Sequence, residues 1–244
     1  MFNNLKILSL EKNTKRRKFM DHKLKQVGIR DYNFFDAIDG NDIKEYQDYE
    51  NFCKKHSRKI LNGAQGAFGC LMSYKKLFFN QSQSCLVLED DVYFHKSHQK
   101  IITDLESENV FKNYDIVYLG YNNYRLSERQ ELSIKNNDFL MPVEHEYKFM
   151  TCGTFAIWYS TKAISYLNAR LQNIKYEDIK PIDHIVWYLS KRLKSIIINP
   201  PLCITEVRDS DIRISREMHS FYKQRHIDIS DYLSVDEYEK NIIY

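Results

Sequence analysis

The sequence predicts an α/β fold, with a single domain built on a mainly parallel, twisted β-sheet flanked by helices. Short apolar segments typical of buried strands alternate along the chain with amphipathic or polar segments of helical length. Strands that alternate with helices are joined by helical crossovers, which pair the strands in parallel. The 244 residues suffice for one large domain with a sizeable core, and no internal repeat or low-complexity linker divides them.

Seven apolar segments predict the strands. They are residues 5–10, 32–35, 85–88, 92–94, 115–120, 149–159 and 196–198. Helices are expected between them, where a capping residue such as Asn13 or Ser160, or a first-turn proline such as Pro181, opens a helical segment. These helices are expected at about residues 14–24, 42–58, 67–80, 97–107, 163–171 and from 181 onward. Segment 121–146 is polar and irregular, and we expect a mobile acceptor loop or lid there.

Three carboxylates, Glu89, Asp90 and Asp91, directly follow the apolar segment 85–88. Adjacent anions at the end of a buried strand repel one another and resist desolvation, so they need a neutralising cation or must stay in water. Side chains alternate along an extended chain, which would put Glu89 and Asp91 on one face and Asp90 on the other. An oxygen-only pair of this kind suits Mg²⁺ or Mn²⁺, which also bind phosphate oxygens. The alternative is an ordinary solvated turn.

The net charge of +3 is too small for a protein dedicated to nucleic acids, although basic residues cluster at 12–18 and 54–59. Each cluster could attract phosphate or an anionic membrane face, or could be the solvated face of a helix. Five scattered cysteines without a CxxC pair argue against zinc and fit free thiols in a reducing compartment. Because neither a signal-peptide stretch nor a bilayer-spanning run occurs, we expect a cytoplasmic protein with at most peripheral contact to a membrane surface.

Eight segments resemble, in the same order, the motifs of a known family. They are residues 7–17, 35–40, 66–73, 86–92, 114–120, 153–163, 181–183 and 210–212. The plainest read Ala-Ile-Asp-Gly at 37–40, Gly-Ala-Phe-Gly-Cys-Leu-Met-Ser at 66–73 and Leu-Val-Leu-Glu-Asp-Asp-Val at 86–92. The chain thereby resembles glycosyltransferase family 25, which groups lipopolysaccharide β-galactosyltransferases with collagen galactosyltransferases. The resemblance covers about residues 5–215 of a single domain, 1–244, and leaves 216–244 as a charged, partly helical tail.

This resemblance implies a GT-A fold and the transfer of a hexose, galactose or glucose, from a UDP-sugar to an acceptor hydroxyl with inversion at the anomeric carbon. It implies Mn²⁺ or Mg²⁺ as cofactor and a glycan, a lipid-linked glycan or a glycoprotein as acceptor, with no nucleic-acid partner. The sequence departs from the family pattern at Ala67, where the family has Glu, and at Tyr74, where it has His. These departures motivate an alternative, a catalytically weak or inactive relative that binds a nucleotide sugar or a glycan. The acceptor, the donor sugar and the oligomeric state stay open.

By their positions in the motifs, six residues are expected to bind the donor. They are Leu10, Arg16, Asp39, Ser73, Glu89 and Asp90. The resemblance also makes Asp91, together with Glu89, the expected ligand of the metal that neutralises the leaving diphosphate. Simpler interpretations remain for Arg16, as a solvated residue at a helix start, and for Asp39, as a turn former before a glycine.

An inverting transfer needs a general base for the acceptor hydroxyl. Asp183, in Pro-Ile-Asp at a helix start, is the first candidate, and Asp211 is the second. An acidic residue favoured there by the helix dipole is the competing interpretation of Asp183. His184 and His219 are candidates for a third metal ligand, although a single histidine is more often structural or exposed.

Overall fold

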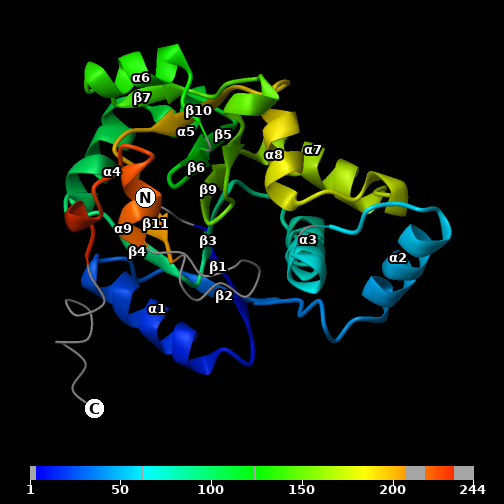
Figure 1. The fold of residues 1–244 in the computed structure, drawn as a ribbon. Helices are drawn as coiled ribbons and strands as arrows, with labels where there is room; N and C mark the ends of the chain where they lie inside the picture. Colours follow the sequence, from blue (N-terminus) through cyan, green and yellow to red (C-terminus); the bar gives the residue numbers. More distant parts are fainter. Residues whose placement is uncertain (1–3, 62, 124, 207–217, 234–244) are drawn as a thin grey trace.

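The structure, a computed structural model, describes residues 4–61, 63–123, 125–206 and 218–233. Its centre is a seven-stranded sheet in the order β2-β1-β3-β9-β5-β10-β7 (Figure 1). The strands are β1 (Leu5–Leu10), β2 (Asn33–Ala37), β3 (Cys85–Glu89), β5 (Ile116–Tyr118), β7 (Leu140–Pro142), β9 (Ala156–Tyr159) and β10 (Ser195–Ile198). Strands β2, β1, β3, β5 and β10 of this sheet share one direction, which β9 and β7 oppose. The predicted α/β class with a mainly parallel sheet is confirmed.

Helices cover both faces of the sheet (Figure 1). One face carries α3 (Ala64–Phe79), α7 (Thr161–Gln172) and α8 (Ile182–Ser190), and α2 (Lys44–Lys55) packs on the outer side of α3. The other carries α1 (Thr14–Gln26), α4 (His98–Ser107) and α5 (Val110–Asn113). Strand β3 is buried on both sides, since Val87 packs into the first core while Leu86 and Leu88 pack into the second. This two-sided burial explains why the strand is a continuous apolar run in the sequence.

The segment expected to be an irregular loop, 121–146, contains regular structure, so that expectation is wrong. It forms β6 (Asn122–Asn123), α6 (Glu128–Lys135) and β7, and η1 (Tyr147–Phe149) follows. A capping box opens α6, because Ser127 Oγ accepts from the Gln130 backbone N–H at 3.2 Å while Gln130 Oε1 accepts from the Ser127 N–H at 3.2 Å. The Ser-x-x-Gln spacing was the sequence signal for this helix.

The strand predicted at 149–159 is divided in two. Its first part, β8 (Thr151–Cys152), pairs with β6 outside the main sheet, and its last part is β9. Gly153 turns the chain between them with φ +85°, a backbone conformation that residues other than glycine rarely adopt. The division places Thr154 beside the end of β3, where its Oγ1 donates to Glu89 at 3.1 Å.

A small second layer adjoins the end of β3. Strand β4 (Val92–Phe94) pairs antiparallel with β11 (Cys203–Thr205), a strand that was not predicted from the sequence. Helices α9 (Met218–Lys223) and η3 (Ile229–Asp231) lie beside this pair. Tyr93, Ile204 and Tyr222 are buried together in this layer. A further short helix, η2 (Tyr176–Asp178), precedes α8. The described part of the C-terminal segment therefore packs onto the strand that follows the three carboxylates.

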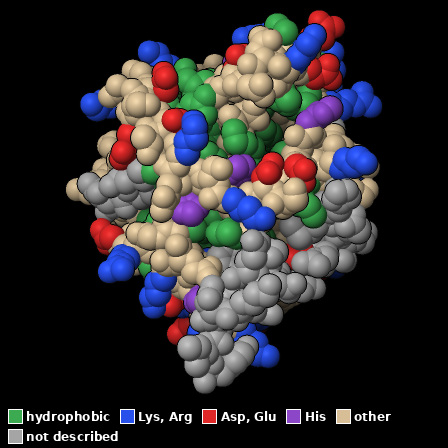
Figure 2. Space-filling view, turned by 90° about the vertical axis from the view of Figure 1, so that its left-hand side faces the viewer, with side chains coloured by type: hydrophobic (Ala, Val, Ile, Leu, Met, Phe, Trp, Pro, Cys, Tyr) green, Lys and Arg blue, Asp and Glu red, His purple; other side chains and the backbone are tan. Residues whose placement is uncertain are grey.

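None of the helices in the described part of the chain combines the length and the apolar character that crossing a bilayer would take. Figure 2 shows the face that carries α4 and α9, where Lys and Arg side chains lie among Asp and Glu side chains. Among the described residues of this face, positively and negatively charged side chains are therefore interspersed.

The loop after β2 lies directly on the first turns of α3. A Cβ atom on Gly69 would lie 2.5 Å from the backbone nitrogen of Gly40 and 2.6 Å from the carbonyl oxygen of Ile38. Ser73 Oγ joins the same two segments, since it accepts from the Ile38 N–H at 2.7 Å and donates to the Gly69 carbonyl at 2.7 Å. This contact fixes the loop that carries Asp39.

We expect Gly69→Ala to destabilise the protein by about 1–3 kcal/mol, because backbone atoms occupy the space that the new methyl group needs. Helix propensity alone predicts the opposite sign, since Ala is favoured over Gly by about 1 kcal/mol inside a helix. Urea denaturation of the two proteins measures the difference, and an increase in the free energy of unfolding would contradict the close contact.

Candidate functional site

The carboxyl ends of three neighbouring strands, β2, β1 and β3, open into a cleft of about 240 Å³, here called the acidic cleft. The seven residues expected to bind the donor or to be the first-choice metal ligands line it. They are Leu10, Arg16, Asp39, Ser73, Glu89, Asp90 and Asp91. Ligands of open α/β sheets collect at this edge. The structure thus brings together, from four separate segments, the residues that the sequence assigned to one site.

The three carboxylates do not follow the predicted alternation of faces. Strand β3 ends at Glu89, Asp90 and Asp91 form a turn, and β4 begins at Val92. Because the extended backbone ends at Glu89, side chains no longer alternate between two faces at Asp90 and Asp91. All three residues line the acidic cleft. The prediction that Asp90 points away is therefore wrong.

Asp90 is held by residues at the end of β1 and the start of α1. It is buried, Ser9 Oγ donates to its Oδ2 at 2.5 Å, and Arg16 Nη1 lies 3.7 Å from its Oδ1. Arg17 braces the same strand end, since its Nη2 donates to the Ser9 carbonyl at 2.8 Å and to Asp36 Oδ1 at 2.7 Å. Asp90 and Arg16 therefore form one charged unit at the tip of β1.

Glu89 is held from the opposite side of β3. Its Oε1 accepts from Thr154 Oγ1 at 3.1 Å, and the Thr154 carbonyl accepts from the Tyr74 hydroxyl at 2.8 Å. Tyr74 is fully buried, and neither it nor Ala67 is among the described residues that line the acidic cleft. The family departure at residue 74 thus acts on Glu89 through Thr154.

One oxygen of Asp91 is shielded and has no hydrogen-bond partner in the described part of the chain. Its Oδ1 is inaccessible to solvent and accepts no hydrogen bond from the residues that the structure describes. Burial and the like charge of Asp90 raise the pKa of this carboxyl to about 6. A hydrogen bond from the Thr205 side chain and the positive charges of Arg16 and Lys23 act in the opposite direction. A buried anionic oxygen without a donor suits a cation. The described residues contain no group of three or more His, Cys, Asp or Glu side chains placed to hold a metal, so the protein would supply few of the ligands.

Lys23 is a buried cation near this cluster that the sequence analysis missed. Its Nζ donates to the Val92 carbonyl at 2.6 Å and lies 3.9 Å from the centre of the Tyr93 ring. Burial lowers the pKa of Lys23 to about 8, while Asp91 and Asp90 act to raise it. The available signal was its position in the buried stripe of α1, between Met20 and Leu24.

The loop after β2 contributes Asp39 to the cleft. Its carboxylate forms an ion pair with Lys12 and accepts from the Asn41 backbone N–H at 3.0 Å. These hydrogen bonds hold the pKa of Asp39 below its ordinary value. Ser73, which bridges Ile38 and Gly69, is fully buried, so its main visible role is to position this loop.

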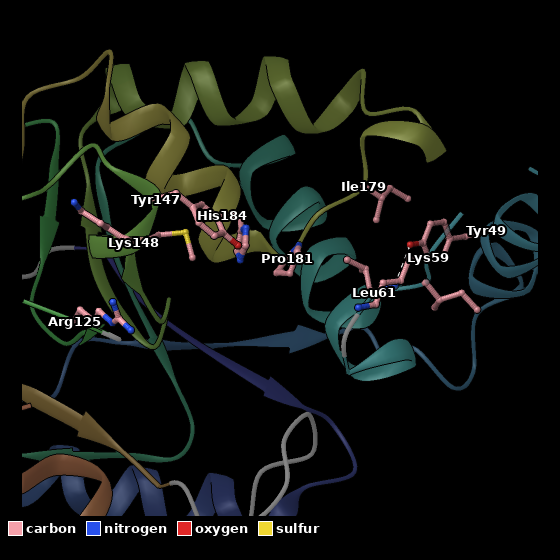
Figure 3. Close-up of a pocket in the computed structure, with 11 residues that line it drawn as sticks. Tyr49, Lys59, Leu61, Arg125, Tyr147, Lys148, Ile179, Pro181 and His184 are labelled. Carbon is pink, nitrogen blue, oxygen red and sulfur yellow. Dashed lines mark hydrogen bonds between the residues drawn. The ribbon is translucent and has the colours of Figure 1, made fainter. Parts of the chain in front are cut away.

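Asp183 does not line the acidic cleft. It lies in the first turn of α8, where its Oδ1 accepts from the His184 N–H at 2.9 Å. His184 lines a second cleft of about 540 Å³, here called the basic cleft, together with Lys59, Arg125, Tyr147 and Lys148 among others (Figure 3). His184 is thus not among the described residues that line the acidic cleft. Asp211 and the side chain of His219 lie outside the described residues.

A group of buried polar atoms near the end of β5 lacks partners among the described residues. It comprises both amide atoms of Asn122, Oδ1 of Asn123, Oγ1 of Thr151 and the Tyr118 hydroxyl. A Cβ on Gly153 would lie 3.5 Å from Asn122 Nδ2, which places this amide next to the segment that carries Thr154. Buried polar groups are nearly always hydrogen-bonded, so these atoms are candidates for contact with a polar ligand.

A cleft with carboxylates and an arginine at the carboxyl ends of parallel strands is typical of α/β proteins that bind small ligands. The model of glycosyltransferase family 25 (LPS biosynthesis protein) matches residues 2–185, and the chain belongs to this family. A comparison with curated proteins finds no significant match.

Two solved structures resemble the whole chain at low similarity. The inositol-1-phosphate CTP transferase from T. maritima has 11% identity and a TM-score of 0.43, with 98% of this chain and 94% of that one covered. A protein described as a glucose-1-phosphate thymidylyltransferase from Bacillus anthracis, in complex with a sucrose, has 14% identity and a TM-score of 0.41, with 93% and 97% covered. At these scores the two structures add nothing to the assignment of the site.

We expect Asp91→Asn to stabilise the protein at pH 7.5 in EDTA by about 1–3 kcal/mol, because it removes a buried anion. The pKa of Asp91 rises from 3.8 in a free carboxyl to about 6 in the fold. The folded protein then binds the proton more tightly, so wild-type stability falls as pH rises from about 4 to about 6. The gain from the substitution should therefore vanish near pH 4.

Urea denaturation at pH 4.5 and pH 7.5 measures this difference. Asp39→Asn is the matched control, and we expect it to lower the free energy of unfolding at pH 7.5. The pKa of Asp39 is lowered in the fold, so its ionised form stabilises the protein at neutral pH. An Asp91→Asn protein less stable than wild type at pH 7.5 would show that the carboxylate is already neutralised within the fold.

Proposed function

We propose that the chain is a metal-dependent inverting glycosyltransferase that moves a hexose, galactose or glucose, from a UDP-sugar to a hydroxyl of a glycan or glycoprotein acceptor. Membership of family 25 supports glycosyltransferase activity in lipopolysaccharide biosynthesis. The observation that carries the finer proposal is the shielded Oδ1 of Asp91, which has no hydrogen-bond partner among the described residues and belongs to a cleft shared with Glu89 and Asp90. An anion that burial removes from water is suited to a cation that arrives with the substrate.

Mn²⁺ or Mg²⁺ would be held by Asp91 and Glu89. When bound, such an ion supplies Lewis-acid stabilisation of the charge that develops on a leaving diphosphate. Ions of this kind keep waters and take phosphate oxygens as further ligands, so one or two protein carboxylates suffice. The absence of a third acidic, histidine or cysteine ligand among the described residues is consistent with that mode of binding.

The residues of the chain itself would hold the nucleotide and the sugar. Arg16 lines the cleft while paired with Asp90, and its guanidinium can donate to diphosphate oxygens through parallel N–H groups. Asp39, kept ionised by its neighbours, can accept hydrogen bonds from hydroxyl groups of the donor. Asn122, whose side-chain amide has no partner among the described residues, can offer it to the hydroxyls of the transferred hexose.

In the proposed reaction the acceptor oxygen attacks the anomeric carbon, and the bond from that carbon to the diphosphate oxygen breaks. The bonding electron pair leaves with UDP, and the hydroxyl proton passes to a carboxylate. Asp183 is the proposed base because it opens α8 beside the basic cleft and adjoins His184, which lines that cleft. Asp211 remains the second candidate.

We expect Asp91→Ala to lower kcat for UDP release by at least about 100-fold in the presence of Mn²⁺, because the leaving diphosphate loses its metal. The measurement is UDP release from a panel of UDP-sugars with an acceptor mixture, with and without EDTA. Activity that persists in EDTA would overturn the metal dependence. Tight binding of a UDP-sugar without turnover under any condition would support the alternative, a relative that only binds the nucleotide sugar.

We expect Asp183→Asn to lower kcat by about 100- to 10,000-fold with little change in the KM for the UDP-sugar, because a general base acts only in the chemical step. The pH–rate profile is measured in parallel, since loss of the base should remove its acidic limb. A variant with wild-type kcat and an unchanged pH profile would transfer the role to another residue.

A further inference from the structure

The basic cleft is lined by cations and by no acidic side chain among the residues that the structure describes. Lys59 precedes α3, Arg125 follows β6, and Lys148 belongs to η1, so the positive charge comes from three separate segments. Figure 3 shows Arg125 and Lys148 at one end of the cleft and Lys59 at the other, with His184 and Pro181 between them. A hollow bordered by charges of one sign raises the local concentration of oppositely charged ligands.

Two of these cations have no counter-charge among the described residues. Lys59 and Arg125 take part in no ion pair there, although each is exposed. Lys148 pairs with Glu146 at 3.0 Å, but both side chains are more than half exposed, and pairs of this kind contribute little. An anion entering the cleft would therefore displace no strong internal interaction.

The cleft also presents an aromatic surface. Tyr147 is 66% exposed, and its ring centre lies 5.9 Å from that of His184 and 6.0 Å from that of Trp187. Trp187 is itself fixed, since its Nε1 donates to the Glu144 carbonyl at 2.8 Å. Aromatic rings with few polar groups around a concave site are typical of places that bind ring-shaped polar ligands, and about 540 Å³ suits a ligand of small-molecule size.

The two clefts are neighbours along two segments of the chain. Met150 lines the basic cleft, and Thr154, four residues on, donates to Glu89 of the acidic cleft. Leu61 lines the basic cleft, and Gly66, at the start of α3, lines the acidic one. Four or five residues span at most about 14–18 Å, so a saccharide of one or two rings in the basic cleft can reach a sugar held beside Glu89.

We propose that the basic cleft is the acceptor site and that the acceptor is an anionic glycan, carrying a phosphate or a carboxylate beside the sugar that is extended. This inference rests on the proposed glycosyltransferase function. Arg125 is assigned the main contact, because an arginine can hold either oxyanion through two parallel N–H donors. Lys59 and Lys148 add charge at the two ends of the cleft, and Tyr147 supports a sugar ring.

The test is a binding measurement by calorimetry on the full chain, with four probes: galactose 6-phosphate, glucuronic acid, galactose and inorganic phosphate. We expect the two anionic sugars to bind at least about 10-fold more tightly than galactose, and galactose 6-phosphate more tightly than phosphate alone. Arg125→Glu should weaken both anionic sugars by at least about 10-fold, and Arg125→Lys should restore part of the loss. Lys112→Glu, the same charge change at an exposed residue of α5 that does not line the cleft, should leave their binding unchanged.

Equal affinities for galactose and for its anionic relatives would overturn the proposal, as would anionic-sugar binding that survives Arg125→Glu in a protein with the wild-type melting temperature. Phosphate that binds as tightly as galactose 6-phosphate would also overturn it, because the site would then recognise an anion and no glycan. Turnover of UDP-sugars with Mn²⁺ is measured separately on the wild type. If the wild type does not turn over any UDP-sugar, the proposed function is wrong. If it does turn over a UDP-sugar but shows no preference for anionic sugars, only the inference about the acceptor is wrong.

Discussion

The acidic cleft depends on how the fold holds three adjacent carboxylates at the end of a buried strand. Each carboxylate is supported by a different part of the chain: Asp90 by β1 and the start of α1, Glu89 by Thr154, and Asp91 by the layer around β11. The backbone is pinned as well, since the Glu89 N–H donates to the Phe155 carbonyl at 2.9 Å. Burial, together with the like charge of Asp90, raises the pKa of Asp91 to about 6.

The C-terminal segment belongs to this support. The Glu206 N–H donates to the Asp91 carbonyl at 2.9 Å, which fixes the acidic turn against the end of β11. The Tyr222 hydroxyl in turn bridges the backbone of Thr205, accepting from its N–H at 2.9 Å and donating to its carbonyl at 2.9 Å. Tyr222 is fully buried, so these two hydrogen bonds tie α9 to the end of β11. The described part of a segment that looks like a charged tail in the sequence therefore stabilises the turn.

Sequence reasoning found the parts of the site that depend on local pattern. The apolar run before Glu89 and the glycine after Asp39 mark strand ends, and strand ends of a parallel sheet meet at one edge, so their convergence could be predicted. It could not place Lys23 or Thr154, because their roles come from contacts between distant elements. It also missed the order of the sheet, in which β9 enters antiparallel between β3 and β5, since strand order depends on packing that no local signal records.

The two departures from the family pattern take on a different meaning in the fold. Ala67 and Tyr74 are both buried on α3, and neither is among the described residues lining the acidic cleft. Burial raises the pKa of Tyr74 well above its ordinary value, so its hydroxyl stays a neutral donor to the Thr154 carbonyl. Since Thr154 in turn donates to Glu89, Tyr74 sets the orientation of that carboxylate without standing in the path of a ligand. Tyr74 therefore acts on the site through Thr154 and does not line the acidic cleft itself. For this reason, Tyr in place of the family's His at residue 74 is weak evidence for an inactive relative.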